Sequence, residues 1–333
     1  MGDEANVPVK PEKARDDASS RVTRLAPSPT GALHLGNAFS FLLAWGLARS
    51  RGWRIVLRIE DLDTPRVKPG AVEQTVDLLR WLGIDWDDGP MLQSLDLTPY
   101  SDAMRSLASS GRAYPCDLTR SEIESAASAP QEGSGETVFP RSLRPEPRPR
   151  AFEARGGNWR FAVPDEPVEF TDELLGPQRI ALPDTIGDFV VWTKRDQPSY
   201  QLAVVIDDHR QGVTDIVRGN DLLESAPRQL ALARALGLEW APRYWHTPLV
   251  RGTDGLRLAK RHGDTRLATW REQGLDPRRV IALAGLWAGL LPPDSVEPEP
   301  MSADEFRDRL DPSRIPDSDV IFDERAQRWL TGC

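Results

Sequence analysis

The sequence predicts an α/β protein whose main domain is built on a parallel β-sheet. Strand-length and helix-length patterns alternate through residues 21–113, as they do in βαβ units. Residues 156–191 instead show short strand patterns separated by turns, among them 159–163 and 179–182, which indicates an inserted α+β piece with antiparallel strands. Helical patterns prevail after residue 251, so the last segment of the chain should be helical.

Composition limits the class of protein. The chain has 333 residues, 39% of them hydrophobic, which is enough for two or three domains with a sizeable core. No apolar run approaches the ~18 residues of a membrane span, and the N-terminus lacks a signal-peptide core, so we expect a cytoplasmic protein with no membrane partner. The net charge of −9 gives no general attraction to nucleic acid. An RNA partner would therefore need local basic patches, such as 139–160 and 257–279.

The stretch 21–49 predicts a strand, a stiff turn and a helix. Residues 21–26 alternate polar and apolar side chains, two prolines and a glycine then break the chain, and 33–49 is a long apolar run with polar interruptions. Such a unit brings a helix N-terminus to a ligand at the end of a parallel strand. His34 in the first helical turn can donate to a phosphate, and Gly36 lets a ligand approach the backbone. Taken alone, a histidine after a proline-rich turn is more often an ordinary surface residue, so His34 needs the support of other motifs.

The remaining elements continue the alternation. A strand predicted at 54–59 ends in the acidic run 60–63, at the sheet edge where open α/β sheets bind ligands. Apolar stretches at 199–206 and 213–218 predict two more strands. Helical spacing and end signals predict helices at 69–83, 99–110, 220–236, 265–273, 277–291 and 303–310.

Several motifs occur in the order typical of one family. Residues 24–31 (RLAPSPTG) and 34–37 (HLGN) resemble the "HIGH" region of class I glutamyl-tRNA synthetases, and 58–63 (RIEDLD) resembles their second-strand signature. Residues 257–261 (RLAKR) stand where the "KMSKS" loop belongs. The resemblance covers nearly all of 21–291. It implies a Rossmann-like class I aminoacyl-tRNA synthetase catalytic domain.

The chain is still more similar to a short paralogous family, the glutamyl-queuosine tRNA(Asp) synthetases, most clearly at residues 205–229. Full-length glutamyl-tRNA synthetases continue into an anticodon-binding region, whereas little more than a short helix or two follows residue 291 here. The resemblance implies a ligase that uses ATP and Mg²⁺ to convert L-glutamate to glutamyl-adenylate without tRNA. It implies transfer of the glutamate to queuosine in the anticodon stem-loop of tRNA(Asp). We expect a monomer.

The matching motif positions imply a role for each site residue. The catalytic residues are His34 and Lys260. Glutamate would be bound by Arg24, Ala26, Ser28, Glu60, Tyr200 and Arg218. ATP would be bound by Pro27, Thr30, His34, Gly36, Asn37, Arg257, Leu258 and Lys260. The residue types suit this chemistry, because arginine forks pair with carboxylates and fixed positive charge stabilises phosphates that gain charge during the reaction.

Two departures from the family pattern affect these expectations. The loop carries arginine at 257 and alanine at 259 where the family has lysine and serine, while Lys260 is intact. Where the paralogues often bind zinc, Cys116 remains but Leu118 replaces its partner, and Phe139 and Leu143 stand near the later ligands. One cysteine without a nearby histidine cannot make a tetrahedral zinc site. We therefore expect no metal there and a buried Cys116 thiol.

These expectations divide the chain into five parts. They are a disordered tail at 1–20, the first half of the catalytic domain at 21–113, an inserted sub-domain at 114–195, the second half at 196–250, and the KMSKS-like loop with helical C-terminal segment at 251–333. Two alternatives stay open, a truncated glutamyl-tRNA synthetase that charges tRNA(Glu) and a non-catalytic binding paralogue. A dinucleotide-dependent enzyme is disfavoured because no G-x-G-x-x-G motif is present.

Overall fold

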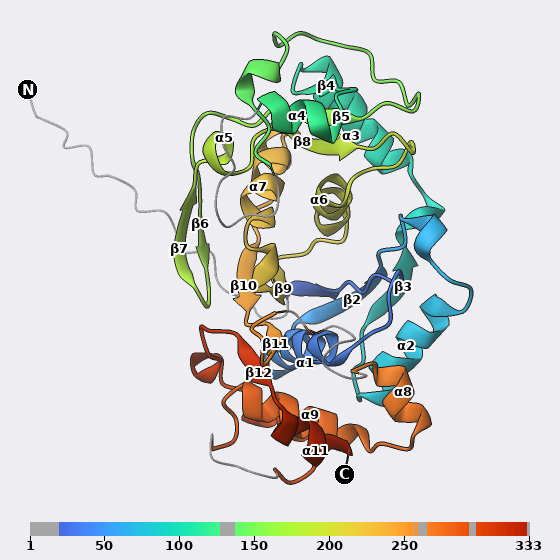
Figure 1. Ribbon diagram of the computed structural model, residues 1–333, viewed down its shortest axis with the longest axis vertical. Coiled ribbons are helices and arrows are strands. Elements are labelled where there is room, and N and C mark those ends of the chain that lie inside the picture. Colours follow the sequence, from blue (N-terminus) through green and yellow to red (C-terminus); the bar gives the residue numbers. More distant parts are fainter. Residues whose placement is uncertain (1–19, 127–136, 257, 259–264, 293–297, 332–333) are drawn as a thin grey trace, which may run out of the picture.

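The computed structural model of the protein describes residues 20–126, 137–256, 258, 265–292 and 298–331 (Figure 1). The predicted disordered tail lies outside these ranges except for Ser20, and so do Arg257, Ala259 and Lys260 of the KMSKS-like loop. Along the long axis, a small antiparallel sub-domain occupies one end, parallel strands lie in the middle, and C-terminal helices occupy the other end (Figure 1).

Three parallel strands form the N-terminal sheet, in the order β1-β2-β3. The strands are β1 Val22–Leu25, β2 Arg54–Ile59 and β3 Asp88–Leu92. The helices of this half are α1 Leu35–Ser50, α2 Ala71–Trp81 and α3 Thr98–Ser109. These elements confirm the predicted strands at 21–26 and 54–59 and the predicted helices at 33–49, 69–83 and 99–110.

A second sheet has the order β7-β6-β10-β9. Its strands are β6 Val168–Asp172, β7 Gly176–Ile180, β9 Asp215–Gly219 and β10 Arg243–Thr247. β9 lies beside β1, because Thr23 Oγ1 donates to the Asp215 carbonyl at 2.8 Å and the backbone N–H groups of Val22 and Thr214 donate across the same gap. The central strands therefore follow the order β3-β2-β1-β9-β10. This is the doubly wound order, in which a ligand crevice forms where the strand order reverses, between β1 and β9.

The strand predicted at 199–206 is wrong, because this segment is the start of helix α6, Tyr200–Arg210. Residues 201–208 are all buried, so polar and apolar residues do not alternate with a helical period. Without that period, the sequence pattern cannot distinguish a buried helix from a buried strand. The helix signal is Ser199, the N-cap, whose hydroxyl accepts the N–H of Leu202. The strand predicted at 213–218 is confirmed by β9, and the helix predicted at 220–236 corresponds to a short 3₁₀ turn followed by α7, Ser225–Ala235.

The antiparallel sub-domain has the strand order β4-β5-β8. Its elements are β4 Ala113–Pro115, α4 Arg120–Ala126, β5 Trp159–Phe161, α5 Leu182–Thr185 and β8 Phe189–Trp192. A separate apolar cluster fills it, made of Tyr114, Cys116, Ile123, Phe139 and Ala162 with Leu118 and Leu143 packed against them. Cys116 is a buried free thiol, as predicted. The β6–β7 hairpin, although it lies within residues 114–195, instead extends the β9–β10 sheet.

The C-terminal part is helical with two short strands. Its elements are β11 Val250–Gly252, α8 Leu267–Glu272, α9 Pro277–Trp287, α10 Ala303–Arg309, β12 Val320–Phe322 and α11 Glu324–Thr331. β12, which the sequence reasoning missed, pairs in parallel with β11. Helices α9 and α10 pack on α1, where Gly46 lies against Phe306 and Leu310. Helix α1 is thus buried between the sheets and the C-terminal helices.

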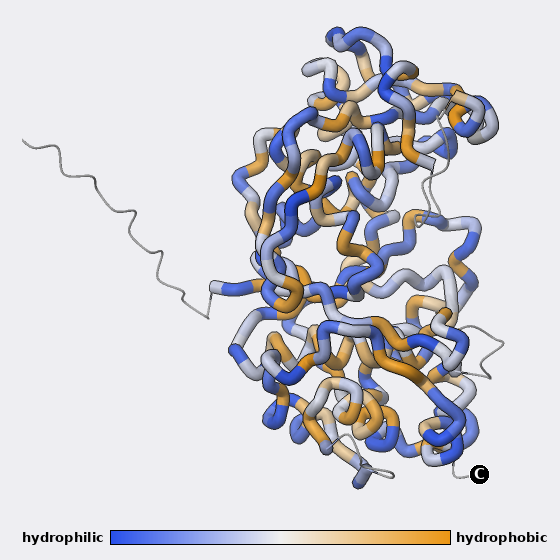
Figure 2. Tube along the Cα trace, turned by 60° about the vertical axis from the view of Figure 1, so that its left-hand side comes forward, coloured by the Kyte–Doolittle hydropathy of each residue, from blue (hydrophilic) through white to orange (hydrophobic). Residues whose placement is uncertain are grey.

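Burial follows the same layers. Apolar segments gather toward the inside of the trace, and hydrophilic turns follow its outline (Figure 2). The larger core contains α1, β2, α9 and α10, and a second core joins α3, α6, α7 and the sub-domain strands. None of the helices within the described ranges has the length and apolar character needed to cross a membrane.

We predict that the sub-domain folds without zinc, because apolar side chains fill the place where ligands would stand. Dialysis against a chelator should leave the thermal unfolding midpoint unchanged. As a control, Phe139→Ala should lower stability by about 3–5 kcal/mol, since it opens a cavity in the cluster. A midpoint that falls on chelation, together with about one bound zinc per chain, would contradict the prediction.

Candidate active site

A cavity of about 1140 Å³ opens at the carboxyl ends of β1 and β9, where the strand order reverses. We call it the switch-point cavity. Of the residues that the sequence assigned to a site, those lining it are Arg24, Ala26, Ser28, His34, Gly36, Asn37, Glu60, Tyr200, Arg218 and Leu258. Pro27 and Thr30 stand beside this wall: the Pro27 carbonyl accepts the N–H of Glu60, and the Thr30 hydroxyl is hydrogen-bonded to Ser28. Arg257 and Lys260 lie outside the described residues.

His34 is the N-cap of α1, so it sits at the positive end of the helix dipole. Its Nδ1 accepts the N–H of Gly36 at 3.1 Å, and its own N–H donates to Asn37 Oδ1 at 3.0 Å. Because Nδ1 is an acceptor, a neutral His34 carries its proton on Nε2. A side chain at Gly36 would place Cβ 3.1 Å from the His34 ring. A larger residue at position 36 would push the imidazole aside, so glycine is needed there to keep His34 in place.

Leu258 of the KMSKS-like loop and the chain that follows the loop lie near the start of α1. Leu258 lines the wall itself. After the loop, the Thr265 carbonyl accepts the N–H of Leu35, and the N–H of Leu267 donates to the Leu33 carbonyl, both at 3.0 Å. The chain that returns from the loop is thereby fastened to the start of α1. Residues 265–267 thus lie against the start of α1, next to His34.

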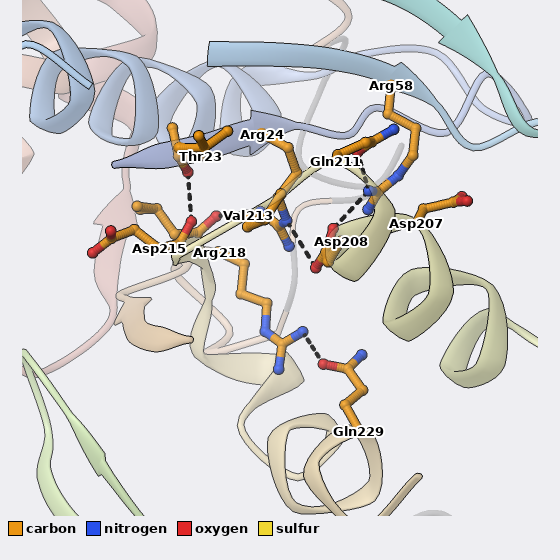
Figure 3. A network of polar contacts seen from close by, with 12 residues as sticks. Thr23, Arg24, Arg58, Asp207, Asp208, Gln211, Val213, Asp215, Arg218 and Gln229 are labelled. Carbon is orange, nitrogen blue, oxygen red and sulfur yellow. Dashed lines mark hydrogen bonds and ion pairs between the residues drawn. The ribbon is translucent and has the colours of Figure 1, made fainter. Parts of the chain in front are cut away.

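Arg24 is held from behind by a buried carboxylate (Figure 3). Its Nη1 donates to the Val217 carbonyl at 3.1 Å, and its Nε lies 3.4 Å from Asp208 Oδ2. The other oxygen of Asp208, whose side chain is fully buried, receives Arg58 Nη1 at 2.6 Å. One carboxylate of α6 therefore pairs with guanidinium groups from β1 and β2. The sequence reasoning missed both Asp208 and Arg58 as members of this site.

Glu60 lies next to these arginines at the cavity wall. Its Oε1 is 3.2 Å from Arg58 Nη2. Burial raises the pKa of Glu60, and the charges of Arg58 and Arg24 oppose that rise. A cation that enters the cavity would favour the ionised form further. Glu60 is therefore suited to receive an ammonium group.

Arg218 reaches the cavity from β9 and is 6% exposed. Its Nη1 donates to Gln229 Oε1 at 2.9 Å, and its Nε donates to His246 Nε2 at 3.1 Å. Its Nη2 is buried and has no hydrogen-bond partner among the described residues. Tyr200, at the first turn of α6, lines the same cavity and is 37% exposed. The arrangement offers a carboxylate at least one unused guanidinium nitrogen.

Within the described part of the chain, no group of three or more His, Cys, Asp and Glu side chains is placed to hold a metal ion. The polar groups of the cavity wall are instead arginines, a lysine, hydroxyls, amides, the N-terminus of α1 and the carboxylates of Glu60, Asp63 and Asp221. Arg24, Arg218 and the N-terminus of α1 suit anionic groups of a ligand, and Glu60 suits a positive group.

A family model described as the catalytic domain of class I tRNA synthetases (E and Q) matches residues 21–325. A Glutamyl-Q tRNA(Asp) synthetase from Rhodopirellula baltica is 44% identical over 329 residues, which cover 92% of this chain and 98% of that protein. A protein of the same name from Symbiobacterium thermophilum is 46% identical over 323 residues, which cover 93% and 98% of the two chains.

Solved structures resemble the fold as well. A glutamate-tRNA synthetase from Elizabethkingia anophelis superposes with a TM-score of 0.75 at 26% identity, over 93% of this chain and 69% of that chain. A glutamate tRNA ligase from Elizabethkingia meningosepticum, in complex with its amino acid, gives a TM-score of 0.74 at 26% identity, over 93% and 68% of the two chains.

We predict that Asp208→Asn lowers the free energy of unfolding by about 3–5 kcal/mol, because it leaves Arg24 and Arg58 buried with one negative charge fewer. Urea unfolding measures this loss. Asp88→Asn is the matched control: Asp88 pairs with Arg54 on the exposed edge of the same sheet, so its loss should cost less than about 1 kcal/mol. Equal losses in the two variants would contradict the role of Asp208.

Proposed function

The chain belongs to the class I tRNA synthetases of the E and Q type, which are ligases, and from that premise we propose its substrates. We propose that it activates L-glutamate with ATP to glutamyl-adenylate without tRNA, and transfers the glutamate to queuosine in the anticodon loop of tRNA(Asp). The names of relatives that this chain spans almost entirely support this proposal. The observation that carries it is a pair of buried arginines, Arg24 and Arg218, that reach one cavity from two strands.

Glutamate fits this cavity by its charges. It has two carboxylates and one ammonium group, and the cavity wall includes the two buried arginines Arg24 and Arg218 together with the Glu60 carboxylate. Ser28, Tyr200 and the backbone at Ala26 can add hydrogen bonds. Glutamine lacks one carboxylate, so a buried guanidinium would stay short of its ion pair when glutamine binds. We therefore propose that the site prefers glutamate to glutamine.

Activation requires placement more than it requires a covalent intermediate with the protein. A carboxylate oxygen of glutamate attacks the α-phosphorus of ATP, and the bond from that phosphorus to the bridging oxygen breaks to release pyrophosphate. Negative charge increases on the phosphate oxygens in the transition state, so fixed donors there accelerate the step. His34 can donate from Nε2 at the α1 N-terminus, and we assign the opposite contact to Lys260. Mg²⁺, held largely by the oxygens of ATP, would offset the phosphate charge.

The remaining ATP contacts follow from the same wall of the cavity. Gly36 and Asn37 belong to the first turn of α1, and Leu258 precedes Lys260 in the loop. Pro27 and Thr30 shape the turn between β1 and α1. We propose that these residues and Arg257 hold the nucleotide.

We propose that RNA phosphates contact only part of the basic patch at 139–160. Arg144 donates a hydrogen bond to the buried Asp188 carboxylate. Arg160 donates to the Asp188 backbone carbonyl, and its guanidinium lies over the Phe139 ring. Arg148 and Arg155, by contrast, have exposed side chains. Contacts from such exposed arginines would make tRNA binding weaken as salt rises, despite the net charge of −9.

The test of this function loads labelled glutamate onto tRNA(Asp) with and without queuosine, and onto tRNA(Glu). We expect glutamate to load tRNA(Asp) only when queuosine is present. The queuosine-free tRNA(Asp) is the matched control, since it differs in one modified base. Equal loading of the queuosine-free tRNA, or loading of tRNA(Glu), would instead assign the chain to 3′-end aminoacylation.

A further inference from the structure

Behind the cavity, Arg218 is supported by two residues that do not touch the ligand space. His246, on β10, accepts the Nε–H of Arg218 at its own Nε2. The other ring nitrogen, Nδ1, lies 2.6 Å from Asp172 Oδ2, at the end of β6. His246 is 1% exposed and Asp172 is equally buried. The three side chains form a line from the β6–β7 hairpin through β10 to the cavity.

From this geometry we propose that Asp172 and His246 are positioning residues that hold Arg218 in place for the carboxylate of glutamate. We call the pair the Asp172–His246 brace. The proposal rests on the proposed function, because it takes glutamate as the ligand of Arg218. Neither residue was found from the sequence, and each acts on the substrate only through the arginine.

The first argument is the tautomer of His246. Nε2 can accept from Arg218 only if the ring proton is on Nδ1, and a carboxylate beside Nδ1 favours that form. Asp172 has both oxygens fixed for this task. Oδ1 accepts the backbone N–H groups of Leu174 and Leu175 in the hairpin turn, while Oδ2 accepts the N–H of His246 as well as facing its ring. The hairpin turn thus fixes the orientation of the Asp172 carboxylate, and the carboxylate fixes the tautomer and orientation of the His246 ring.

The second argument is charge. Burial lowers the pKa of His246, and the charge of Arg218 lowers it further, although the hydrogen bond to Asp172 and the backbone of Leu222 raise it. A neutral imidazole and the neutral Gln229 amide therefore hold Arg218 on two edges. Gln229 is itself fixed by Gln201, which donates to Ser225. A carboxylate in either place would neutralise the guanidinium and compete with the substrate. Neutral acceptors instead leave its positive charge for the ligand.

The third argument is where the brace begins. Asp172 lies in the hairpin that the sequence assigns to the inserted segment, and β6 pairs with β10 at Tyr244. Tyr244 stacks on His246 with 5.8 Å between ring centroids, and its ring lies under the Arg218 guanidinium. The hairpin therefore contributes to the amino-acid site although no residue of β6 or β7 lines the cavity.

Two substitutions at one position test the brace. In His246→Asn the side chain can still donate to Asp172 but ends short of Arg218, whereas in His246→Gln an amide oxygen can reach the position of Nε2. We expect His246→Asn to raise the KM for glutamate by about tenfold in ATP–pyrophosphate exchange without tRNA. We expect His246→Gln to stay within about threefold of the wild type, with the KM for ATP unchanged in both variants.

The matched control is Trp245→Phe, on the same strand. Trp245 points to the opposite face, where its Nε1 donates to Asp215, so this change should lower stability and leave the KM for glutamate unchanged. A wild-type KM in His246→Asn, equal KM values in the Asn and Gln variants, or an equal rise in Trp245→Phe would each overturn the proposal.

A second measurement needs no variant. Nitrogen NMR of the imidazoles in the wild-type protein should show His246 neutral, with its proton on Nδ1. A proton on Nε2, or a charged ring at neutral pH, would refute the brace even if every variant failed to fold. A wild-type protein without glutamate-dependent exchange would refute the proposed function instead, and the NMR result would then decide the brace by itself.

Discussion

The structure around the cavity depends on the buried carboxylate of Asp208. It faces Arg24 from β1 and Arg58 from β2, while α6, which carries it, begins at Tyr200 on the cavity wall. Burying a guanidinium is costly unless it is paired, so the sheet can present arginines to a ligand only if a fixed counter-charge lies behind them. The pairing also fixes α6 across the ends of the parallel strands. The cationic site and the packing of the central helix therefore have one common cause.

The two arginines are held by different means. Arg24 shares the charge of Asp208, whereas both hydrogen-bond partners of Arg218 are neutral. Arg218 keeps more of its positive charge and should therefore attract a carboxylate more strongly. Arg24 is partly neutralised by Asp208, so it should contribute mainly by orienting the carboxylate through hydrogen bonds. Glu60 adds a carboxylate to these two arginines, and burial raises the pKa of that carboxylate. Arg24, Arg218 and Glu60 thus complement the charges of an amino acid with an acidic side chain, which has two carboxylates and one ammonium group.

Patterns within short stretches of sequence correctly predicted several strands and helices. The β1–turn–α1 unit, β2 and the helices α2 and α3 follow from periodicity and end signals, and the sites of Arg24 and Arg218 followed from motif resemblance. The buried helix α6 was taken for a strand, because a fully buried run shows no face. The supporting residues were missed because their partners are distant: Arg58 and Asp208 are 150 positions apart, and Asp172 and His246 are 74 apart. Two adjacent aspartates at the end of an apolar run, Asp207 and Asp208, were the available signal.

The most direct test of the account is glutamate-dependent exchange of pyrophosphate into ATP with no tRNA present, repeated with glutamine and with aspartate. A cavity with two buried arginines and Glu60 should support exchange with glutamate. It should give little exchange with glutamine, which leaves a guanidinium unpaired, and little with aspartate, whose second carboxylate is one methylene shorter. Exchange with glutamine at a rate comparable to glutamate, or no exchange until tRNA is added, would contradict the account.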